Sequence, residues 1–271
     1  MKDKKDSFGN RMKEYEAQHS DRLMPRIPVV VRLDGKAFHS FCSGLKRPFD
    51  TRLSQLMIDT TLFLVEETNA RVGYTQSDEI SLVLLADFGR QLWFDRRIAK
   101  MNSVLAAMAS VFFNKHLPSR IPEKINQSPV FDCRVFNVPD QTEAVNYLIW
   151  REKDATRNSV SMAAQSYFSH RKLQGKSRSE MMDMLFSKDI NWNDYPTHFR
   201  RGTYVQRQKI ERPFTTQELA LLPPKHNAHK DPNLKVVRTD HVILELPPLT
   251  QVKNREAVIF NGDKPNGNEE D

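Results

Sequence analysis

The chain has 271 residues, a hydrophobic share of 39% and a mean hydropathy of −0.61. No apolar run approaches the length of a membrane helix, so this composition excludes a membrane-spanning protein. The 41 basic residues exceed the 34 acidic residues, giving a formal net charge of +7, which favours a polyanionic partner. The only cysteines are Cys42 and Cys133, and they lack the spacing of a metal or redox motif. The first residues lack the apolar segment of a signal peptide, and we expect a cytoplasmic protein.

The N-terminal third alternates strand and helix patterns. Residues 7–19 resemble an exposed amphipathic helix, and the β-branched run at residues 29–31 indicates a buried strand. The apolar residues of 51–67 keep helical spacing, and Asp50 is placed to cap that helix. Two apolar runs, 70–74 and 80–85, flank a short acidic turn and predict a hairpin.

A second helix is predicted over residues 91–116, and Pro118 and Pro122 then interrupt the chain. Residues 130–139 alternate apolar and polar side chains, as a half-buried strand does. The resulting order is strand, helix, strand, strand, helix, strand. This is the βαββαβ pattern of ferredoxin-like domains. The fold class is therefore α+β, a polymerase-palm-like antiparallel sheet with helices on one face and a mostly helical C-terminal extension. Nucleotide cyclases share this order, so fold alone leaves function open.

Three segments are expected along the chain. We expect residues 1–139 to form a palm-like domain and residues 140–260 to form a helical and mixed region that packs on the palm. The second region is helical to about residue 185, then Pro-rich, with a late strand at 241–246. The tail, residues 261–271, has little to bury and is predicted to be disordered.

Two acidic corners are the most informative local features. Asp34 ends the first strand, and Asp78 lies in the hairpin turn. If their strands are neighbours, the two carboxylates face each other at the sheet edge. They can then hold two divalent cations roughly 3.5–4 Å apart, as nucleotidyl transfer requires. The alternative is that both are ordinary turn acids, since Asp-Gly is a common turn pair.

The motifs around these corners resemble the tRNA-histidine guanylyltransferase family, which are 3′→5′ polymerases. The similarity begins with RLDGKAFHSF at residues 32–41 and YTQSDEIS at 74–81. Four further motifs follow in order: RRIAK at 96–100, FDCRVF at 131–136, YLIWR at 147–151 with Asp154-Ala155, and FRRGT at 199–203. Six collinear motifs are far more specific than any one of them.

The resemblance implies a two-Mg²⁺ enzyme that uses ATP and GTP or other nucleoside triphosphates, with tRNA as its substrate. Asp34, Gly35 and Asp78 would bind the metals, with Asp34 and Asp78 as the catalytic carboxylates. The residues expected to bind nucleotide are Arg32, Lys36, Ala37, Phe38, His39, Lys46, Asp50, Ser77, Glu79, Arg96, Arg97 and Lys100. The residues expected to contact RNA are Arg157, Asn158, Ser159, Arg200 and Arg201. The resemblance thus makes 1–139 the catalytic domain and 140–260 the region that contributes RNA contacts. Family members form homo-tetramers, and the same is expected here.

One segment departs from the eukaryotic pattern. Residues 157–159 read Arg-Asn-Ser where members that guanylate histidine tRNA carry a His-Ile-Asn-Asn segment. This version resembles the bacterial and archaeal-type proteins, which are associated with template-dependent repair of tRNA 5′ ends. Three alternatives stay open: untemplated guanylate addition to histidine tRNA, a nucleotide cyclase, and a non-catalytic RNA-binding protein on a palm fold.

Overall fold

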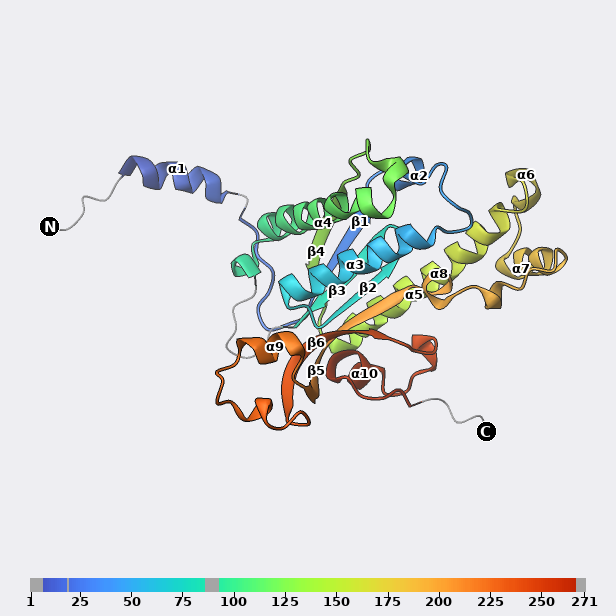
Figure 1. The fold of residues 1–271 in the computed structure, drawn as a ribbon. Helices are drawn as coiled ribbons and strands as arrows, with labels where there is room; N and C mark the ends of the chain where they lie inside the picture. The colour runs from blue at the N-terminus through green and yellow to red at the C-terminus, as the bar shows by residue number, and fades with distance from the viewer. Residues whose placement is uncertain (1–6, 19, 86–92, 267–271) are drawn as a thin grey trace.

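A single antiparallel sheet organises the computed structural model, which describes residues 7–18, 20–85 and 93–266. The strand order is β4-β1-β3-β2-β5-β6 (Figure 1). The strands are β1 (Val29–Gly35), β2 (Val72–Gln76), β3 (Glu79–Leu84), β4 (Phe131–Asn137), β5 (Thr203–Pro213) and β6 (Lys235–Leu244). Asp34 on β1 lies opposite Glu79 on β3, so the end of β1 and the β2–β3 turn meet at one edge.

Two long helices cover the first face of the sheet, as the palm pattern predicts (Figure 1). They are α3 (Thr51–Thr68) and α4 (Ile98–Arg120). Alternate residues of β1, such as Val31 and Leu33, pack against them in one core. Asp50 caps α3 by accepting a hydrogen bond from the Arg52 N–H at 3.0 Å, which confirms the predicted helix start.

The C-terminal half of the chain covers the second face. Helix α5 (Gln141–Gln165) and α10 (Arg255–Asn261) pack there against Val30, Val83 and their neighbours. The far half of α5 forms a third core with the short helices. These include α6 (His170–Leu173), α7 (Arg178–Phe186) and α8 (Thr197–Arg200). The α+β palm class is therefore confirmed, but helices lie on both faces of the complete sheet.

Several predicted boundaries differ from the structure. Helix α4 begins at Ile98 after a 3-10 turn, η1 (Trp93–Arg96), and it continues past Pro118 to Arg120. Proline within the last turn of a helix removes only one backbone donor, so the helix is not broken there. Strand β5 was not predicted, because nearly all side chains in its outer part are polar and therefore show no alternation of polar and apolar residues. It pairs with β2 and draws β6 into the sheet, so β6 begins at Lys235, earlier than expected.

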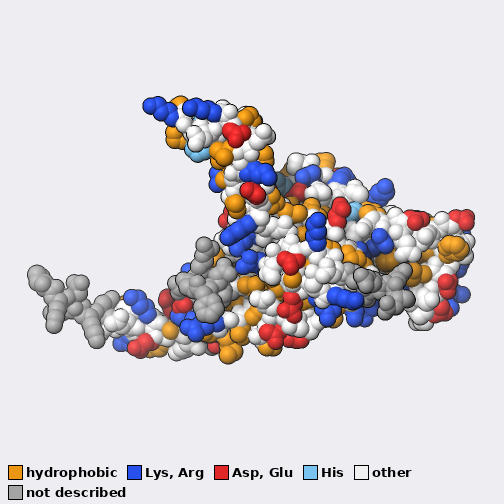
Figure 2. All heavy atoms as spheres, turned by 90° about the horizontal axis from the view of Figure 1, so that it is seen from below, with side chains coloured by type: hydrophobic (Ala, Val, Ile, Leu, Met, Phe, Trp, Pro, Cys, Tyr) orange, Lys and Arg blue, Asp and Glu red, His pale blue; other side chains and the backbone are white. Residues whose placement is uncertain are grey.

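Helix α1 (Ser7–Ala17) projects away from the body, as both overall views show (Figures 1 and 2). It buries no residue, in agreement with the predicted exposed helix. Two short elements, α2 (Phe38–Phe41) and α9 (Thr216–Leu221), lie in connecting segments. Of the predicted disordered tail, residues 267–271 lie outside the described residues, whereas residues 261–266 are described and include the Asn266 N–H, which donates to Asn254 Oδ1 at 2.8 Å. Within the described ranges, no helix is both long and apolar enough to span a bilayer.

Candidate active site

The two acidic corners converge at one edge of the sheet. The Gly35 N–H donates a hydrogen bond to the Asp78 carbonyl at 3.0 Å, which ties the end of β1 to the β2–β3 turn. Gly35 is required sterically, because an added Cβ would lie 2.3 Å from the Phe38 ring. Arg32, two residues earlier on the same face of β1, forms an ion pair with Asp34, with Nη2 3.1 Å from Oδ2. This contact orients the Asp34 carboxylate.

The electrostatics of this corner suit a bound cation. Burial raises the pKa of Asp78, and the negative charge of Asp34 acts in the same direction. Two carboxylates and a backbone carbonyl are hard oxygen donors, of the kind Mg²⁺ prefers when phosphates and water complete its coordination. The described residues hold no cluster of three or more His, Cys, Asp or Glu side chains able to bind a metal. A metal here would therefore depend on substrate oxygens as well as on Asp34, Gly35 and Asp78.

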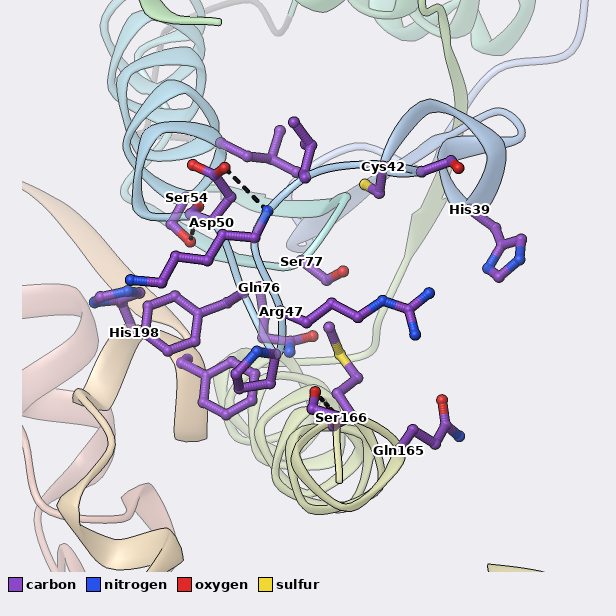
Figure 3. A pocket seen from close by; sticks show the side chains of 18 residues that line it. His39, Cys42, Arg47, Asp50, Ser54, Gln76, Ser77, Gln165, Ser166 and His198 are labelled. Carbon is purple, nitrogen blue, oxygen red and sulfur yellow. Dashed lines mark hydrogen bonds between the residues drawn. The ribbon is translucent and has the colours of Figure 1, made fainter. Parts of the chain in front are cut away.

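A cavity of about 260 Å³ opens beside this corner (Figure 3). Its walls come from the β1–α3 connection, the Ser77 turn, the end of α5 and α8. Apolar side chains, including Leu45, Phe49 and Phe199, line one part, and His39, Lys46 and Arg47 supply polar or cationic groups. An apolar cleft with a few convergent polar groups is typical of a small-molecule site.

Among the described residues that line this cavity, neither the cysteine nor the buried histidine is arranged as an activated nucleophile. Burial raises the pKa of the Cys42 thiol to about 11, so the thiol remains protonated. Burial lowers the pKa of His198, which keeps its imidazole neutral near physiological pH. The Nε2 atom of His198 is buried and has no hydrogen-bond partner among the described residues. Together these features fit ligand binding at this cavity, with the carboxylate corner beside it as the chemical centre.

The structure brings most of the predicted nucleotide residues near the corner. His39, Lys46, Asp50 and Ser77 line the cavity directly. Asp50 also pairs with Arg52 at 2.8 Å, and the Arg52 hydrogen bond is the main reason that the pKa of Asp50 falls to about 2.

Other predicted residues near the corner have different surroundings. The Phe38 ring is 2% exposed and packs against Phe41, Phe113 and Phe131, so its side chain belongs to the core. Lys36 and Ala37 are exposed, and Ala37 has a left-handed backbone. Lys36 and Ala37 both lie on the turn that follows β1.

The structure does not bring the basic group at the start of α4 to the corner of the same chain. The Leu23 N–H donates a hydrogen bond to the Arg96 carbonyl at 2.9 Å. The backbones of Arg22 and Arg97 form an isolated antiparallel β-bridge. These contacts hold Arg96, Arg97 and Lys100 near the beginning of β1, whereas Asp34 is near its end. A strand rises about 3.3 Å per residue, so the two ends of β1 are separated by roughly 20 Å.

The predicted RNA residues divide into exposed and internal groups. Arg157 and Asn158 are exposed on α5. Ser159 is fully buried: its hydroxyl donates to the Arg200 carbonyl at 3.0 Å and accepts from Trp192 Nε1 at 3.2 Å. Arg201 pairs with the buried Glu152 at 3.2 Å.

A second cavity, of about 400 Å³, lies beside these residues. Arg200 and Arg201 line it together with Lys153 and Arg178. Burial lowers the pKa of Arg200, and the neighbouring positive charge of Arg201 adds to the effect. This cavity therefore has a cationic wall in which one guanidinium is repelled by another.

Sequence reasoning missed several residues at these sites. Arg47 and His198 line the first cavity, and Arg151 contacts Glu79 beside the metal corner. Arg47 could have been noticed as a cation between Lys46 and Asp50. Arg151 ends a quoted motif, but only tertiary packing shows which carboxylate it contacts.

Comparisons with known proteins identify the relatives of this chain. A family model described as tRNAHis guanylyltransferase matches residues 9–139. A probable tRNA(His) guanylyltransferase from Bos taurus is 30% identical over 250 residues, covering 87% of this chain and 80% of the relative.

Two solved structures of a bacterial tRNA(His) guanylyltransferase-like protein are also similar. The complex with ATP has 35% identity and a TM-score of 0.74, covering 93% of this chain and 98% of the other. The complex with GTP has 31% identity and a TM-score of 0.71, covering 94% and 98%. The carboxylate corner, the palm sheet and these similarities lead to one assignment: the chain belongs to the tRNA(His) guanylyltransferase family of nucleotidyltransferases.

Proposed function

We propose that this protein adds nucleotides in the 3′→5′ direction to the 5′ end of tRNA. The observation that carries the proposal is the convergence of Asp34 and Asp78 beside a partly cationic cavity, in a chain of this family. Solved bacterial relatives were determined with ATP and with GTP, the two nucleotides that the proposed reaction uses. We also place the activity in the cytoplasm, a proposal supported by the unpaired thiols of Cys42 and Cys133.

The reaction has two phosphoryl-transfer steps. A 5′-monophosphate oxygen of the tRNA attacks the α-phosphorus of ATP and releases pyrophosphate, which leaves an adenylylated 5′ end. The 3′-hydroxyl of the incoming nucleotide then attacks the tRNA 5′ phosphorus, forms the new phosphodiester bond and expels AMP. A 5′-triphosphate end would need no adenylylation and would lose pyrophosphate in the second step.

Enzymes of this family are generally metal-dependent. We propose that the metal is Mg²⁺, with two ions per site, held by Asp34, Asp78 and the Gly35 carbonyl. Bound there, the ions would lower the pKa of the attacking hydroxyl and neutralise charge on the leaving group. Arg32 holds the Asp34 carboxylate in place, and the Gly35–Asp78 hydrogen bond fixes the spacing of the two corners.

The first cavity is the proposed nucleotide site. Its apolar wall fits a heteroaromatic base. Lys46 lines the cavity together with Arg47 and His39, the last two labelled in Figure 3, and these three side chains are the proposed contacts to phosphate oxygens. Ser77 lies at the turn between this cavity and Asp78, and its hydroxyl or N–H can bind a phosphate between the two. We propose these phosphate contacts for Lys46, Arg47, His39 and Ser77.

The proposed RNA surface follows α5 and α8. Arg157 and Asn158 are exposed, and Arg200 lines the cationic second cavity, which supports contacts to backbone phosphates. The side chain of Arg201 is 13% exposed and paired with Glu152, so its share in RNA binding would need that pair to rearrange.

Templated repair of a truncated 5′ end is the finer form of the proposal. Its support is the Arg157-Asn158-Ser159 segment, which departs from the His-Ile-Asn-Asn pattern of guanylate-adding members. The alternative is untemplated addition of a guanylate to histidine tRNA.

The test is incubation of the protein with ATP, all four nucleoside triphosphates, Mg²⁺ and a tRNA that lacks its first nucleotide, followed by 5′-end sequencing. A matched tRNA has its opposing 3′-strand base changed. We expect the added base to follow the opposing base, and Asp34→Ala to add nothing. Addition of G whatever the opposing base would support the alternative, and no addition to either tRNA would contradict the proposed function.

We also propose that the protein assembles as a homo-tetramer. Helix α1 exposes Phe8, Met12 and Tyr15 at i, i+4 and i+7 spacing, so it presents an apolar stripe that the described residues leave exposed to solvent. The distance of Arg96, Arg97 and Lys100 from the corner of their own chain also favours a site completed by a neighbouring copy.

A further inference from the structure

A chain of alternating charges runs from the metal corner across the second face of the sheet. Arg32 Nη2 lies 3.1 Å from Asp34 Oδ2 and 2.8 Å from Glu79 Oε2. Arg151 forms an ion pair with Glu79: its Nη2 donates a hydrogen bond to Oε2 at 2.7 Å, and its Nε lies 2.6 Å from Oε1 without hydrogen-bonding geometry. Asp34 is therefore held by an arginine whose own position depends on a second carboxylate, and that carboxylate is held from α5.

Burial separates the inner part of this chain from the outer part. The side chain of Arg151 is 7% exposed and that of Glu79 is 16% exposed. The chain continues through Asp154 to Arg157, whose side chain is 61% exposed. Exposed ion pairs contribute little, whereas a buried, charge-assisted hydrogen bond between a guanidinium and a carboxylate fixes both partners. The Arg151–Glu79 pair is thus the anchoring contact.

Local packing fixes Arg151 itself. Its guanidinium carbon lies 4.5 Å from the centre of the Trp150 ring, and Asp154 Oδ2 accepts from Nη2 at 2.9 Å. Both Glu79 oxygens are occupied by arginines, so Glu79 is not positioned to bind a metal directly. Without Arg151, the buried Glu79 carboxylate would lose its main partner and could reorient toward solvent or toward the cations.

We propose that Arg151 is a positioning residue for the metal carboxylate Asp34, acting through Glu79 and Arg32. The inference rests on the proposed function, because it assumes that Asp34 binds a cation. The expected change in cation affinity is opposite in sign to the change that loss of a positive charge would cause. If Arg151 acted only as a positive charge, its removal would tighten cation binding; as a positioning residue, its removal weakens cation binding.

The chain offers a matched control for the charge effect. Arg134 on β4 lies directly opposite Arg32 in the β1–β4 register, and its side chain is on the same face of the sheet. It pairs with Asp132 at 3.2 Å, is 56% exposed and stands outside the chain of contacts to Asp34. Removing Arg134 therefore removes one nearby positive charge and leaves the support of Asp34 intact.

The experiment is titration of the full-length protein with Mn²⁺, without nucleotide, followed by calorimetry and by electron paramagnetic resonance of the free ion. The variants are Asp34→Ala, Arg151→Met, Arg151→Lys and Arg134→Met. We expect Arg151→Met to bind Mn²⁺ about 10- to 100-fold more weakly, the usual effect of removing a group that supports a metal ligand. Arg151→Lys should weaken binding as well, because a compact ammonium on a flexible stem cannot reproduce the planar guanidinium that contacts both Glu79 and Asp154. Arg134→Met should bind as tightly as the wild type or more tightly.

The outcomes separate this inference from the proposed function. Equal or tighter Mn²⁺ binding by the Arg151 variants, with binding still lost in Asp34→Ala, would overturn the inference and leave the proposed function standing. Equal binding by Asp34→Ala and the wild type would overturn both, because the cation would then not be at this corner. If Arg151→Met does not fold, Arg151→Lys decides the question, since it keeps the charge and most of the volume.

Discussion

Asp78 is held where folding by itself does not favour a charged carboxylate. Burial raises its pKa, and Asp34 on the neighbouring strand end raises it further. A carboxyl group with a raised pKa in the folded state costs stability once the pH exceeds its usual value, because the unfolded chain releases the proton more easily. A bound cation offsets this cost, so the corner is arranged for ligand binding more than for stability.

We therefore predict opposite effects of Asp78→Asn on stability and on activity. In chelator at neutral pH, the variant should unfold at equal or higher denaturant concentration than the wild type. The difference should vanish below about pH 4, where the wild-type carboxyl is protonated in both states. Nucleotide addition should fall at least roughly a thousandfold, because metal ions contribute several kcal/mol of transition-state stabilisation. Urea titrations at both pH values and an addition assay check this, and near-normal addition by a folded variant would contradict it.

At the scale of elements, α5 connects the parts of the site. Its middle contacts the metal corner through Arg151, its outer surface carries Asn158, and its end closes the nucleotide cavity with Met162 and Ser166. Neighbouring residues on one helix face different directions, because each turns by about 100°. Asn158 is exposed for this reason, whereas Ser159 is buried between α5 and α8.

This geometry predicts different outcomes for two adjacent alanine variants. Ser159→Ala should destabilise the protein by about 1–3 kcal/mol, because the buried Trp192 N–H loses its acceptor. The salt dependence of its tRNA binding should stay at the wild-type slope. Asn158→Ala should leave stability within about 0.5 kcal/mol and weaken tRNA binding. Thermal unfolding and a tRNA-binding salt series measure both. A stable Ser159→Ala protein would show that the buried hydroxyl is not a structural contact.

At the scale of the whole molecule, helix α1 has no residue buried against the rest of the described chain. Helix α1 projects from the body and buries none of its residues (Figure 2). Isolated helices of this length are marginal in water, so an apolar stripe on such a helix needs a partner surface to stay ordered. Assembly of several copies would provide that surface.

Substitutions on α1 should therefore change assembly and leave the fold of the single chain intact. Met12→Arg with Tyr15→Arg should reduce the mass measured by light scattering after size-exclusion chromatography. Lys13→Ala, on the same helix but outside the stripe, should keep the wild-type mass. Circular dichroism should show an almost unchanged body, since α1 contributes no core residue. An unchanged mass in the double variant would exclude this stripe as an assembly surface.

The sequence by itself determined the palm. The run Val29–Val31, the helical spacing in α3 and the hairpin around Asp78 are local patterns, so neighbouring residues suffice to predict them. The meeting of Asp34 and Asp78 also followed from topology, because β1 and β3 are neighbours in this order. The family motifs added the reaction and the substrates.

Only the tertiary structure decided what lies around that centre. Strand β5 is specified by its pairing with the distant β2. Its outer half carries mostly polar side chains, so the sequence there shows no apolar pattern that would predict a strand. The family resemblance placed Arg96 among the nucleotide ligands, although α4 starts at the opposite end of β1 from Asp34. Phe38 and Ser159 were read as ligand contacts, yet their side chains lie in the core. Burial, charge pairing and the direction of each side chain arise when separate elements pack together, so contacts such as Arg151 with Glu79 could be found only there.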